Sequence, residues 1–170
     1  MQTATYLLLI LGFLGAADIA LYHSISHGIR SHAESRHELV VHSLRGPTYF
    51  ALFLLVPNVA MRGAWFWALI ALFVVDLGIS IWDFLIEKKS RRQLGGLPSG
   101  EYVLHIVMAM VFGALVASVF FGAGDWATQP TRLAFEPVAV PTLLRYALGV
   151  MALGVLLSGF QDALAAVRLR

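Results

Sequence analysis

The chain has 170 residues, of which 59% are hydrophobic and 13% charged, with a net charge of +2 and no cysteine. A soluble domain of this size could not bury so much apolar surface, so the composition predicts a multi-pass protein of the cell membrane. The lack of cysteine excludes disulfides, thiolate catalysis, iron–sulfur clusters and cysteine-held zinc, which leaves nitrogen and oxygen ligands for any metal.

The first apolar run, residues 3–22, predicts a transmembrane helix that is retained, because it lacks the basic start of a signal peptide. The polar segment 23–45 follows, and we expect it to form a helix outside the hydrocarbon. A second span is expected over residues 46–61. It contains Pro47 and Pro57, which make it short, and we expect it to continue the polar helix.

Three more spans complete an all-α bundle of about five transmembrane helices, a single domain over residues 1–170. The third is expected over 64–86, between aromatic residues typical of membrane interfaces. The loop 87–99 carries four cations and then glycine and proline. The fourth and fifth spans are expected over 100–122 and 142–167.

The basic residues predict the orientation of the bundle. Nine of the twelve Lys and Arg residues lie after the first span, after the third span and at the C-terminus. By the positive-inside rule these segments are cytoplasmic, which places the N-terminus outside and the C-terminus inside. Because the cations flank apolar runs, we interpret them as topology signals and expect membrane lipid, not nucleic acid, as the partner.

With this topology, every histidine falls at the cytoplasmic end, together with most carboxylates. The groups gathered there are His23, His27, His32, His37, His42, His105, Asp18, Glu34, Glu38, Asp83, Glu87, Glu101 and Asp162. Ionisable groups inside a membrane cost a few kcal/mol each and persist mainly when they are paired, hydrated or bound to metal.

Helical spacing places several of these groups on shared faces. Asp76, Asp83 and Glu87 return to one face of the third span, and Glu101 and His105 are neighbours at the start of the fourth. The two faces can oppose each other, so we expect them to contribute to one site.

The polar segment adds ligands if it is helical. Its HxxxH and ExxH spacings let two side chains of one helix meet a single ion. The resulting hypothesis is a metal site formed by His23, His27, Glu34, His37, Asp83, Glu87, Glu101 and His105. A mixture of imidazole and carboxylate suits iron or manganese, with zinc as a further choice.

The histidines from His23 to His42 and the pair Glu101 and His105 resemble the integral-membrane di-iron oxidoreductases of the desaturase and hydroxylase type. Those proteins also place histidine motifs at the cytoplasmic ends of transmembrane helices. The resemblance implies a di-iron oxidoreductase that acts on a lipid-soluble or amphipathic substrate with an electron donor. The chain departs from the pattern in its small size, its six histidines and its lack of HxxHH.

Two alternatives stay open at this point. His42 and His105 lie at similar depths on facing spans, as the axial ligands of a haem cytochrome would. Alternatively, Asp76, Asp83 and Glu87 could form a stepwise relay in a proton or metal-ion transporter, or in a small subunit of a larger membrane complex.

Overall fold

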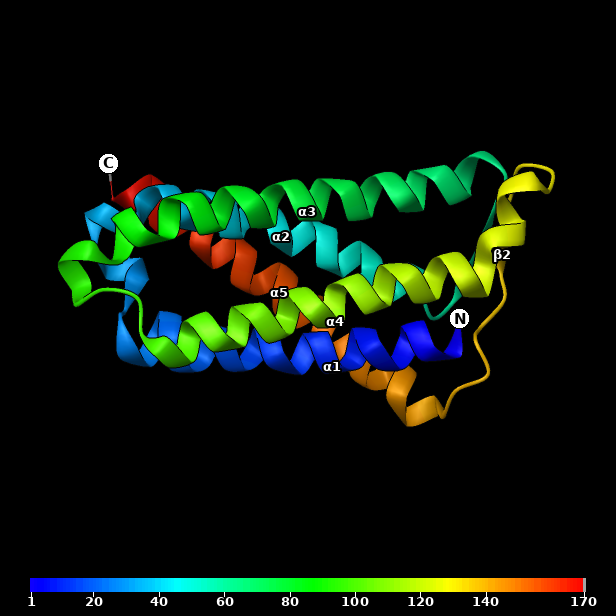
Figure 1. The fold of residues 1–170 in the computed structure, drawn as a ribbon, viewed down its shortest axis with the longest axis horizontal. Helices are drawn as coiled ribbons and strands as arrows, with labels where there is room; N and C mark the ends of the chain where they lie inside the picture. Colours follow the sequence, from blue (N-terminus) through cyan, green and yellow to red (C-terminus); the bar gives the residue numbers. More distant parts are fainter. Residues whose placement is uncertain (170) are drawn as a thin grey trace.

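The computed structural model describes residues 1–169, which form an elongated bundle of five α-helices (Figure 1). They are α1 (Gln2–Asp18), α2 (Arg36–Leu55), α3 (Ala64–Ser90), α4 (Ser99–Ala123) and α5 (Thr142–Arg168). In the bundle α2 packs along α5 and α3, and α1 packs along α4. The predicted helical architecture is confirmed.

Four helical segments of the described chain are long and apolar enough to cross a membrane: Gln2–Ser26, Ala64–Leu94, Ser99–Thr128 and Thr142–Arg168. The second predicted span, residues 46–61, is not among them. The helix there ends at Leu55, and its apolar part from residue 46 is only about 15 Å long, half the thickness of the hydrocarbon. The first half of α2 is polar, so four of the five helices meet the length and hydropathy of a membrane span, and a fifth crossing by α2 stays a prediction.

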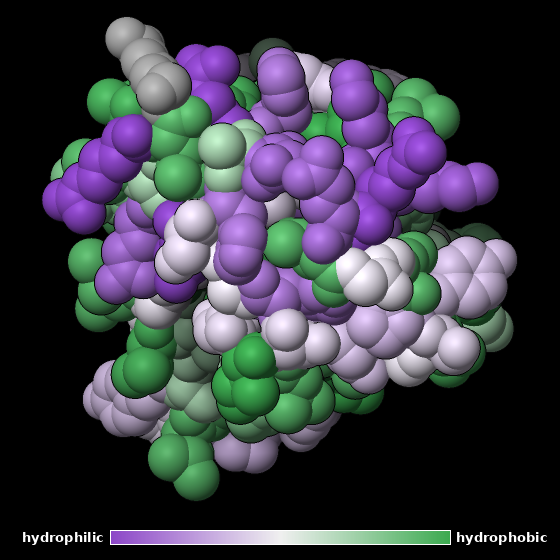
Figure 2. Space-filling view, turned by 90° about the vertical axis from the view of Figure 1, so that its left-hand side faces the viewer, coloured by the Kyte–Doolittle hydropathy of each residue, from purple (hydrophilic) through white to green (hydrophobic). Residues whose placement is uncertain are grey.

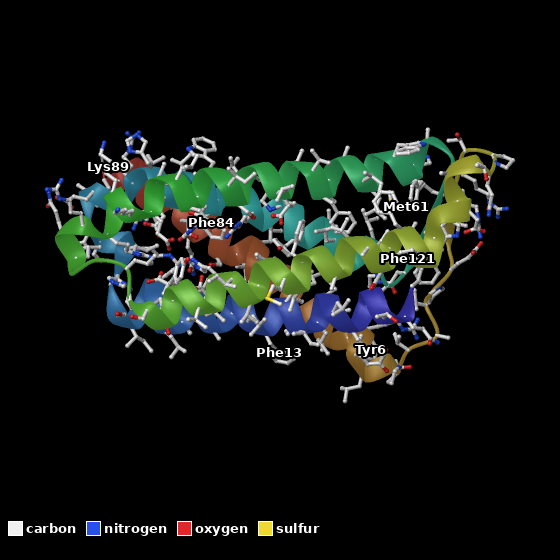
Figure 3. The ribbon with its side chains drawn as sticks, viewed as in Figure 1. Tyr6, Phe13, Met61, Phe84, Lys89 and Phe121 are labelled. Atoms are coloured by element: carbon white, nitrogen blue, oxygen red, sulfur yellow. The ribbon has the colours of Figure 1, made fainter. Side chains whose placement is uncertain are left out.

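The outer faces of the apolar helices carry large hydrophobic side chains. Phe121 on α4 is 92% exposed, and Phe13 on α1 also lies on the outer surface (Figure 3). Apolar side chains that face outward along a whole helix are typical of contact with lipid.

The polar segment is not the single helix expected over residues 23–45. α1 continues as a π-helix, η1 (Ile19–Ser26), and the chain then turns at Gly28, whose φ of 55° lies in the left-handed region that favours glycine. Two short 3₁₀ turns, η2 (Ile29–Ser31) and η3 (Ala33–Ser35), lead into α2. This break changes which side chains of the segment share a face.

The opposite end of the bundle holds a small two-stranded antiparallel sheet, the β1–β2 sheet, that the sequence did not predict. β1 (Val59–Arg62), after α2, pairs antiparallel with β2 (Arg132–Phe135), before α5. Arg62 donates to both carboxylate oxygens of Glu136, at 2.8 and 2.6 Å. These hydrogen bonds hold the pKa of Glu136 below its ordinary value. The β1–β2 sheet joins the segment after α2 to the segment before α5, which are far apart in the sequence.

Apolar and polar interiors are segregated along the bundle. In the half with the β1–β2 sheet the fully buried side chains are apolar except for Thr5. The apolar ones include Leu8, Leu52, Phe66, Leu69, Leu115 and Leu148. The other end, where α1, α3 and α5 finish and α2 and α4 begin, carries most of the buried ionisable groups. We call it the polar end (residues 18–45, 80–105 and 158–169). Figure 2 looks onto it and shows hydrophilic side chains gathered there, with hydrophobic ones toward its edges.

Candidate metal centre

The polar end buries an unusual number of titratable side chains from α1, η1, α2, α3, η4 (Arg91–Leu94) and α4. At most 8% of each is exposed, and they are Asp18, His23, His27, Glu38, His42, Asp83, Glu87, Arg91, Glu101 and His105. Burial on this scale is costly unless the groups satisfy one another or bind a cation.

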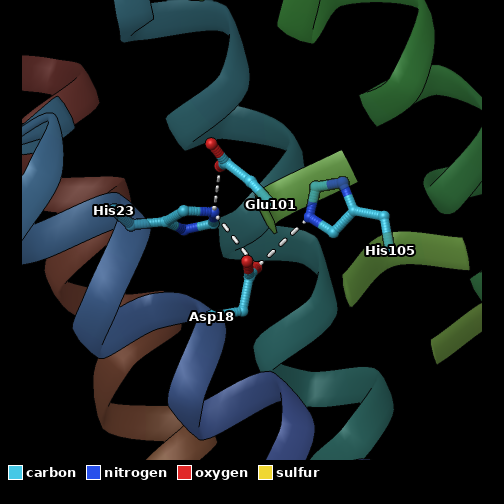
Figure 4. Close-up of side chains that lie close together, drawn as sticks. All are labelled: Asp18, His23, Glu101 and His105. Atoms are coloured by element: carbon cyan, nitrogen blue, oxygen red, sulfur yellow. Dashed lines mark hydrogen bonds and ion pairs between the residues drawn. The ribbon is translucent and has the colours of Figure 1, made fainter. Parts of the chain in front are cut away.

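The first ligand group consists of Asp18, His23, Glu101 and His105, whose ligand atoms all lie within 4.8 Å of one another (Figure 4). Asp18 Oδ2 is 3.2 Å from His23 Nε2 and 3.4 Å from His105 Nε2. His23 Nε2 is also 3.7 Å from Glu101 Oε1. Two imidazoles and two carboxylates from three helical segments thus converge on one point, as ligands of a divalent metal do.

The π-helix explains why Asp18 and His23 meet. Five positions apart, they would point in different directions on a regular α-helix, about 140° from each other. The wider π-helical turn of η1 brings His23 back over Asp18. Such turns inside α-helices are frequent at functional sites.

The second ligand group consists of His23, Glu38 and His42, so His23 belongs to both groups. The His23 and His42 rings stack in parallel, with centroids 4.6 Å apart and an angle of 4° between their planes. His42 Nε2 lies 3.2 Å from Asp83 Oδ1 and 3.9 Å from Glu38 Oε1.

Arg91 joins the two groups. Its guanidinium is fully buried, and Nη2 lies 2.8 Å from Glu38 Oε1 and 2.8 Å from Glu101 Oε1. From the sequence, Arg91 was expected as a topology signal or as an interfacial ion-pair partner of Asp83 and Glu87, because nothing in the local pattern separates it from the exposed Arg92. The structure makes it an interior cation.

The charges of the centre do not balance within the described residues. Two guanidiniums, Arg45 and Arg91, face five carboxylates, which leaves an excess of three negative charges if the imidazoles are neutral. The five carboxylates are Asp18, Glu38, Asp83, Glu87 and Glu101. Protonation of histidines or carboxyl groups, or bound cations, would balance this charge.

Two buried carboxylate oxygens of the first ligand group have no hydrogen-bond partner among residues 1–169. They are Asp18 Oδ1 and Glu101 Oε2, and the nearest imidazole nitrogen recorded for the latter is His27 Nδ1 at 3.9 Å. A buried oxygen without a donor is unfavourable, and metal coordination would satisfy it.

The structure brings six of the eight sequence-derived site residues into or beside these groups. His23, Glu101 and His105 belong to the first group, and Glu87 Oε2 contacts His105 Nδ1 at 3.5 Å. Asp83 Oδ1 lies 3.2 Å from His42 Nε2 of the second group. His27 lies beside the first group, and its Nδ1 is 3.0 Å from the carbonyl oxygen of Tyr22.

Glu34 and His37 are not brought to the centre, because both side chains are exposed at the surface. Their predicted positions assumed one unbroken helix, and the turn at Gly28 shifts the following residues out of that phase. Glu38 and His42 occupy the position in the centre that was expected for Glu34 and His37. The spacing of four between Glu38 and His42 on α2 was the sequence signal that could have identified this pair. The contact between Asp18 and His23 depends on the π-helix, which the sequence pattern does not predict.

A cavity of about 710 Å³ adjoins the centre and extends along the bundle toward its middle. Asp18, His23, His42 and His105 line its polar end, and side chains such as Leu11, Phe53, Phe112 and Met151 line the rest. The volume falls within the range of small-molecule sites, roughly 300–1,000 Å³, and the lining suits an apolar molecule.

Comparison with known proteins gives no relative from which a role could be transferred. No family model matches the chain, and neither the curated proteins nor the solved structures include a significant match. The chemistry of the centre is therefore interpreted from its geometry.

Proposed function

We propose that the chain is an integral membrane oxidoreductase with a two-metal, di-iron type centre at its cytoplasmic face, acting on a lipid-soluble or amphipathic substrate. Manganese or zinc would be alternative metals for the same imidazole and carboxylate ligands. The observation that carries the proposal is the pair of buried ligand groups that share His23 and adjoin an apolar cavity.

Three features support a metal in preference to a simple ion-pair network. With neutral imidazoles the excess of three negative charges favours bound cations, and the unpartnered oxygens of Asp18 and Glu101 offer ligand positions. The carboxylates also bring together side chains from separate helices, which is the arrangement of carboxylate–histidine metal sites in helical bundles. Bound iron would supply redox chemistry, and the protein would supply the ligands, the charge balance and a dry cavity.

The chain's own residues would divide the remaining work. Asp83 and Glu87 lie beside His42 and His105 and would orient those imidazoles. Arg91 would keep Glu38 and Glu101 in place between the two groups. The cavity would hold the hydrocarbon part of the substrate next to the metal and away from water.

The test is metal analysis of purified protein and three single-alanine variants. We expect about two ions per chain in the wild type, one for each ligand group. His23→Ala removes the shared ligand and should abolish most binding, whereas His42→Ala should remove about half. His37→Ala is the matched control, because His37 is exposed and should leave the metal content unchanged. A metal-free wild type, or full metal content in His23→Ala, would refute the proposal.

A haem cytochrome is the second candidate, because His42 and His105 line the same cavity. The Nε2 atoms that would ligate haem iron lie instead against carboxylates, 3.2 Å from Asp83 for His42 and 3.4 Å from Asp18 for His105. This favours the carboxylate–histidine centre. An absorption spectrum with a Soret band would reverse that preference.

A relay through Asp76 and Asp83 is less well supported. Arg45 Nη1 lies 3.2 Å from Asp83 Oδ2, and its Nη2 donates to Ser80 Oγ, which lies between the two aspartates on α3. A fixed guanidinium at this position opposes the passage of cations.

A further inference from the structure

The cavity beside the metal centre is closed at its far end, toward the middle of the bundle. Four helices line that end, through a set of residues that we call the cavity floor: Gly12 of α1, Phe53 of α2, Phe112 of α4 and Met151 of α5. About one turn farther toward the β1–β2 sheet, the same helices carry buried side chains that do not line the cavity: Leu8, Val56, Leu115 and Leu148. The cavity therefore stops at the floor.

Side-chain packing between helices closes the floor. Gly12 has no Cβ, and one placed there would lie 2.7 Å from Met151 Sδ and 3.0 Å from Phe53 Cζ. The ends of these two side chains thus lie directly against the glycine of α1. The Phe112 ring packs edge-on against Phe73 of α3, with ring centroids 5.9 Å apart, so the fifth helix supports the floor from behind.

At the polar end the cavity opens sideways from the bundle. Its lining there includes apolar side chains that are also exposed on the outer surface, such as Ile81 (53% exposed) and Phe84 (44%). Both belong to Ala64–Leu94, a helical segment long and apolar enough to cross a membrane. A molecule that enters past such side chains would come from the hydrocarbon of the bilayer.

The wall between the opening and the floor suits a hydrocarbon chain. Its polar side chains on α2 and α3 contact one another: Tyr49 Oη donates to Asp76 Oδ2 at 3.1 Å, and Arg45 Nη2 donates to Ser80 Oγ at 2.7 Å. The facing wall, on α1, α4 and α5, is apolar and includes Leu11, Ala16, Met108, Phe112 and Val155. An unbranched chain can lie along this apolar wall without separating the polar pairs.

The depth of the floor below the ligand groups sets the length of such a chain. From His105 to Phe112 on α4 is seven residues, roughly 10 Å. From His42 to Phe53 on α2 is eleven residues, roughly 16 Å. An extended hydrocarbon, with C–C bonds of about 1.5 Å, advances roughly 1.25 Å per carbon, so about 8–13 carbons fit over this depth.

We infer that the cavity binds one unbranched hydrocarbon chain of a membrane-dissolved molecule, tail first, and that the floor limits this chain to about 8–13 carbons beyond the ligand groups. Gly12, Phe53 and Met151 would then determine specificity for chain length. The role of the chain as substrate rests on the proposed function. Binding itself does not, because no floor residue belongs to the two ligand groups.

The experiment locates the end of the bound chain by photolabelling. The probes are methyl esters of saturated straight-chain fatty acids of increasing length, each with a diazirine next to its terminal carbon. The neutral head group avoids repulsion by the carboxylates of the centre. The protein in nanodiscs is irradiated with each probe, and peptide mass spectrometry identifies the labelled residues. We expect chains within the limit to label the floor, and chains several carbons longer to label it at least about fivefold less, because the closed end cannot accommodate them.

Two floor variants should move the limit in opposite directions. Met151→Ala removes the three side-chain atoms beyond Cβ and should extend the limit by about two or three carbons. Gly12→Ala places a methyl group against Met151 Sδ. Because the side chains behind the floor are buried, the methionine would have to move into the cavity, which should shorten the limit. The double variant Gly12→Ala/Met151→Ala should relieve this shortening.

Matched controls change neighbouring residues without touching the floor. Gly15→Ala lies in the same cavity, but a Cβ there meets nothing within 4 Å among the described residues. Leu153→Ala shortens a side chain on the outer surface of α5. Both should keep the wild-type limit. Equal labelling of the floor by all chain lengths, or a limit that stays unchanged in both Met151→Ala and Gly12→Ala, would overturn the inference.

Measurements on chelator-treated and metal-loaded protein separate this inference from the proposed function. A chain-length limit in a protein that takes up no metal would leave the chain site standing and remove the metal centre. Metal binding without a chain-length limit would have the opposite meaning.

Discussion

Arg91 is the residue on which both ligand groups depend. Its guanidinium contacts Glu38 and Glu101, one carboxylate from each group, and no part of its side chain is exposed. Removing one partner from a buried ion pair leaves uncompensated charge, which typically costs about 3–5 kcal/mol of stability.

We therefore expect Arg91→Met to destabilise the metal-free protein strongly and added metal to restore much of the loss. A bound divalent ion would replace the missing positive charge beside the two glutamates. The measurement is the thermal unfolding midpoint with chelator and with excess manganese. Arg92→Met is the matched control, because Arg92 is exposed and should change neither value. Equal destabilisation with and without metal would contradict a metal bound by these carboxylates.

Sequence reasoning identified individual site residues where local spacing was sufficient. Glu101 and His105, four residues apart on a regular helix, were expected to be neighbours, and the structure places both in the first ligand group. Glu34 and His37 were misplaced because the helix around them is broken. The burial of Arg91 depends on contacts with two other helices, which no local pattern encodes.

At the scale of the elements, the most extensive helix contact is between α2 and α5, whose backbones approach each other at Gly46 and Gly159. A Cβ added at Gly159 would lie 3.0 Å from Gly46 Cα and 3.3 Å from the carbonyl oxygen of Ser43. Pro47 has no N–H, so the helical hydrogen bonding is already perturbed in this turn of α2. Two glycines let the backbones approach as small residues do in membrane helix pairs.

We expect Gly159→Ala to destabilise the bundle by roughly 1–3 kcal/mol, because the added methyl group meets backbone that cannot move aside easily. Gly149→Ala on the same helix is the control. A Cβ there meets nothing within 4 Å among the described residues, so this change should be neutral or stabilise by about 0.5–1 kcal/mol. Chemical denaturation in detergent would give both values. Equal effects of the two substitutions would show that the α2–α5 contact is not tight.

Element boundaries were predictable where the chain is apolar. The spans expected over 64–86, 100–122 and 142–167 correspond to α3, α4 and α5, whose ends differ by at most four residues. The π-helix η1 and the β1–β2 sheet were not predicted. In the π-helical region Asp18 and His23 contact His105 and Glu101 of α4, and the sheet pairs segments about 70 residues apart.

For the molecule as a whole, the open prediction is the orientation in the membrane. The exposed cations Lys88, Lys89, Arg92 and Arg168 lie at the polar end, and from the positive-inside rule we expect this end to be cytoplasmic. The N-terminus lies at the opposite end, beside the β1–β2 sheet, and would be outside (Figure 1).

The chain has no cysteine, so single cysteines can report this orientation directly. We expect Gln93→Cys, at the polar end, to react with a membrane-impermeant maleimide only after cells are opened. Ala139→Cys, in the connection between β2 and α5, should react in intact cells. Both positions are exposed, so burial does not confound the comparison. The reverse pattern would place the proposed metal centre on the outer face.

The sequence by itself determined the helical class, the apolar helices and the gathering of histidines and carboxylates at one end. These follow from composition and from periods of hydrophobicity, which are properties of short segments. Only the tertiary structure decided which groups meet: the sharing of His23, the bridging by Arg91, the exclusion of Glu34 and His37, and the cavity beside them. Such contacts join segments up to about 90 residues apart, and they depend on packing between helices that the local pattern does not contain.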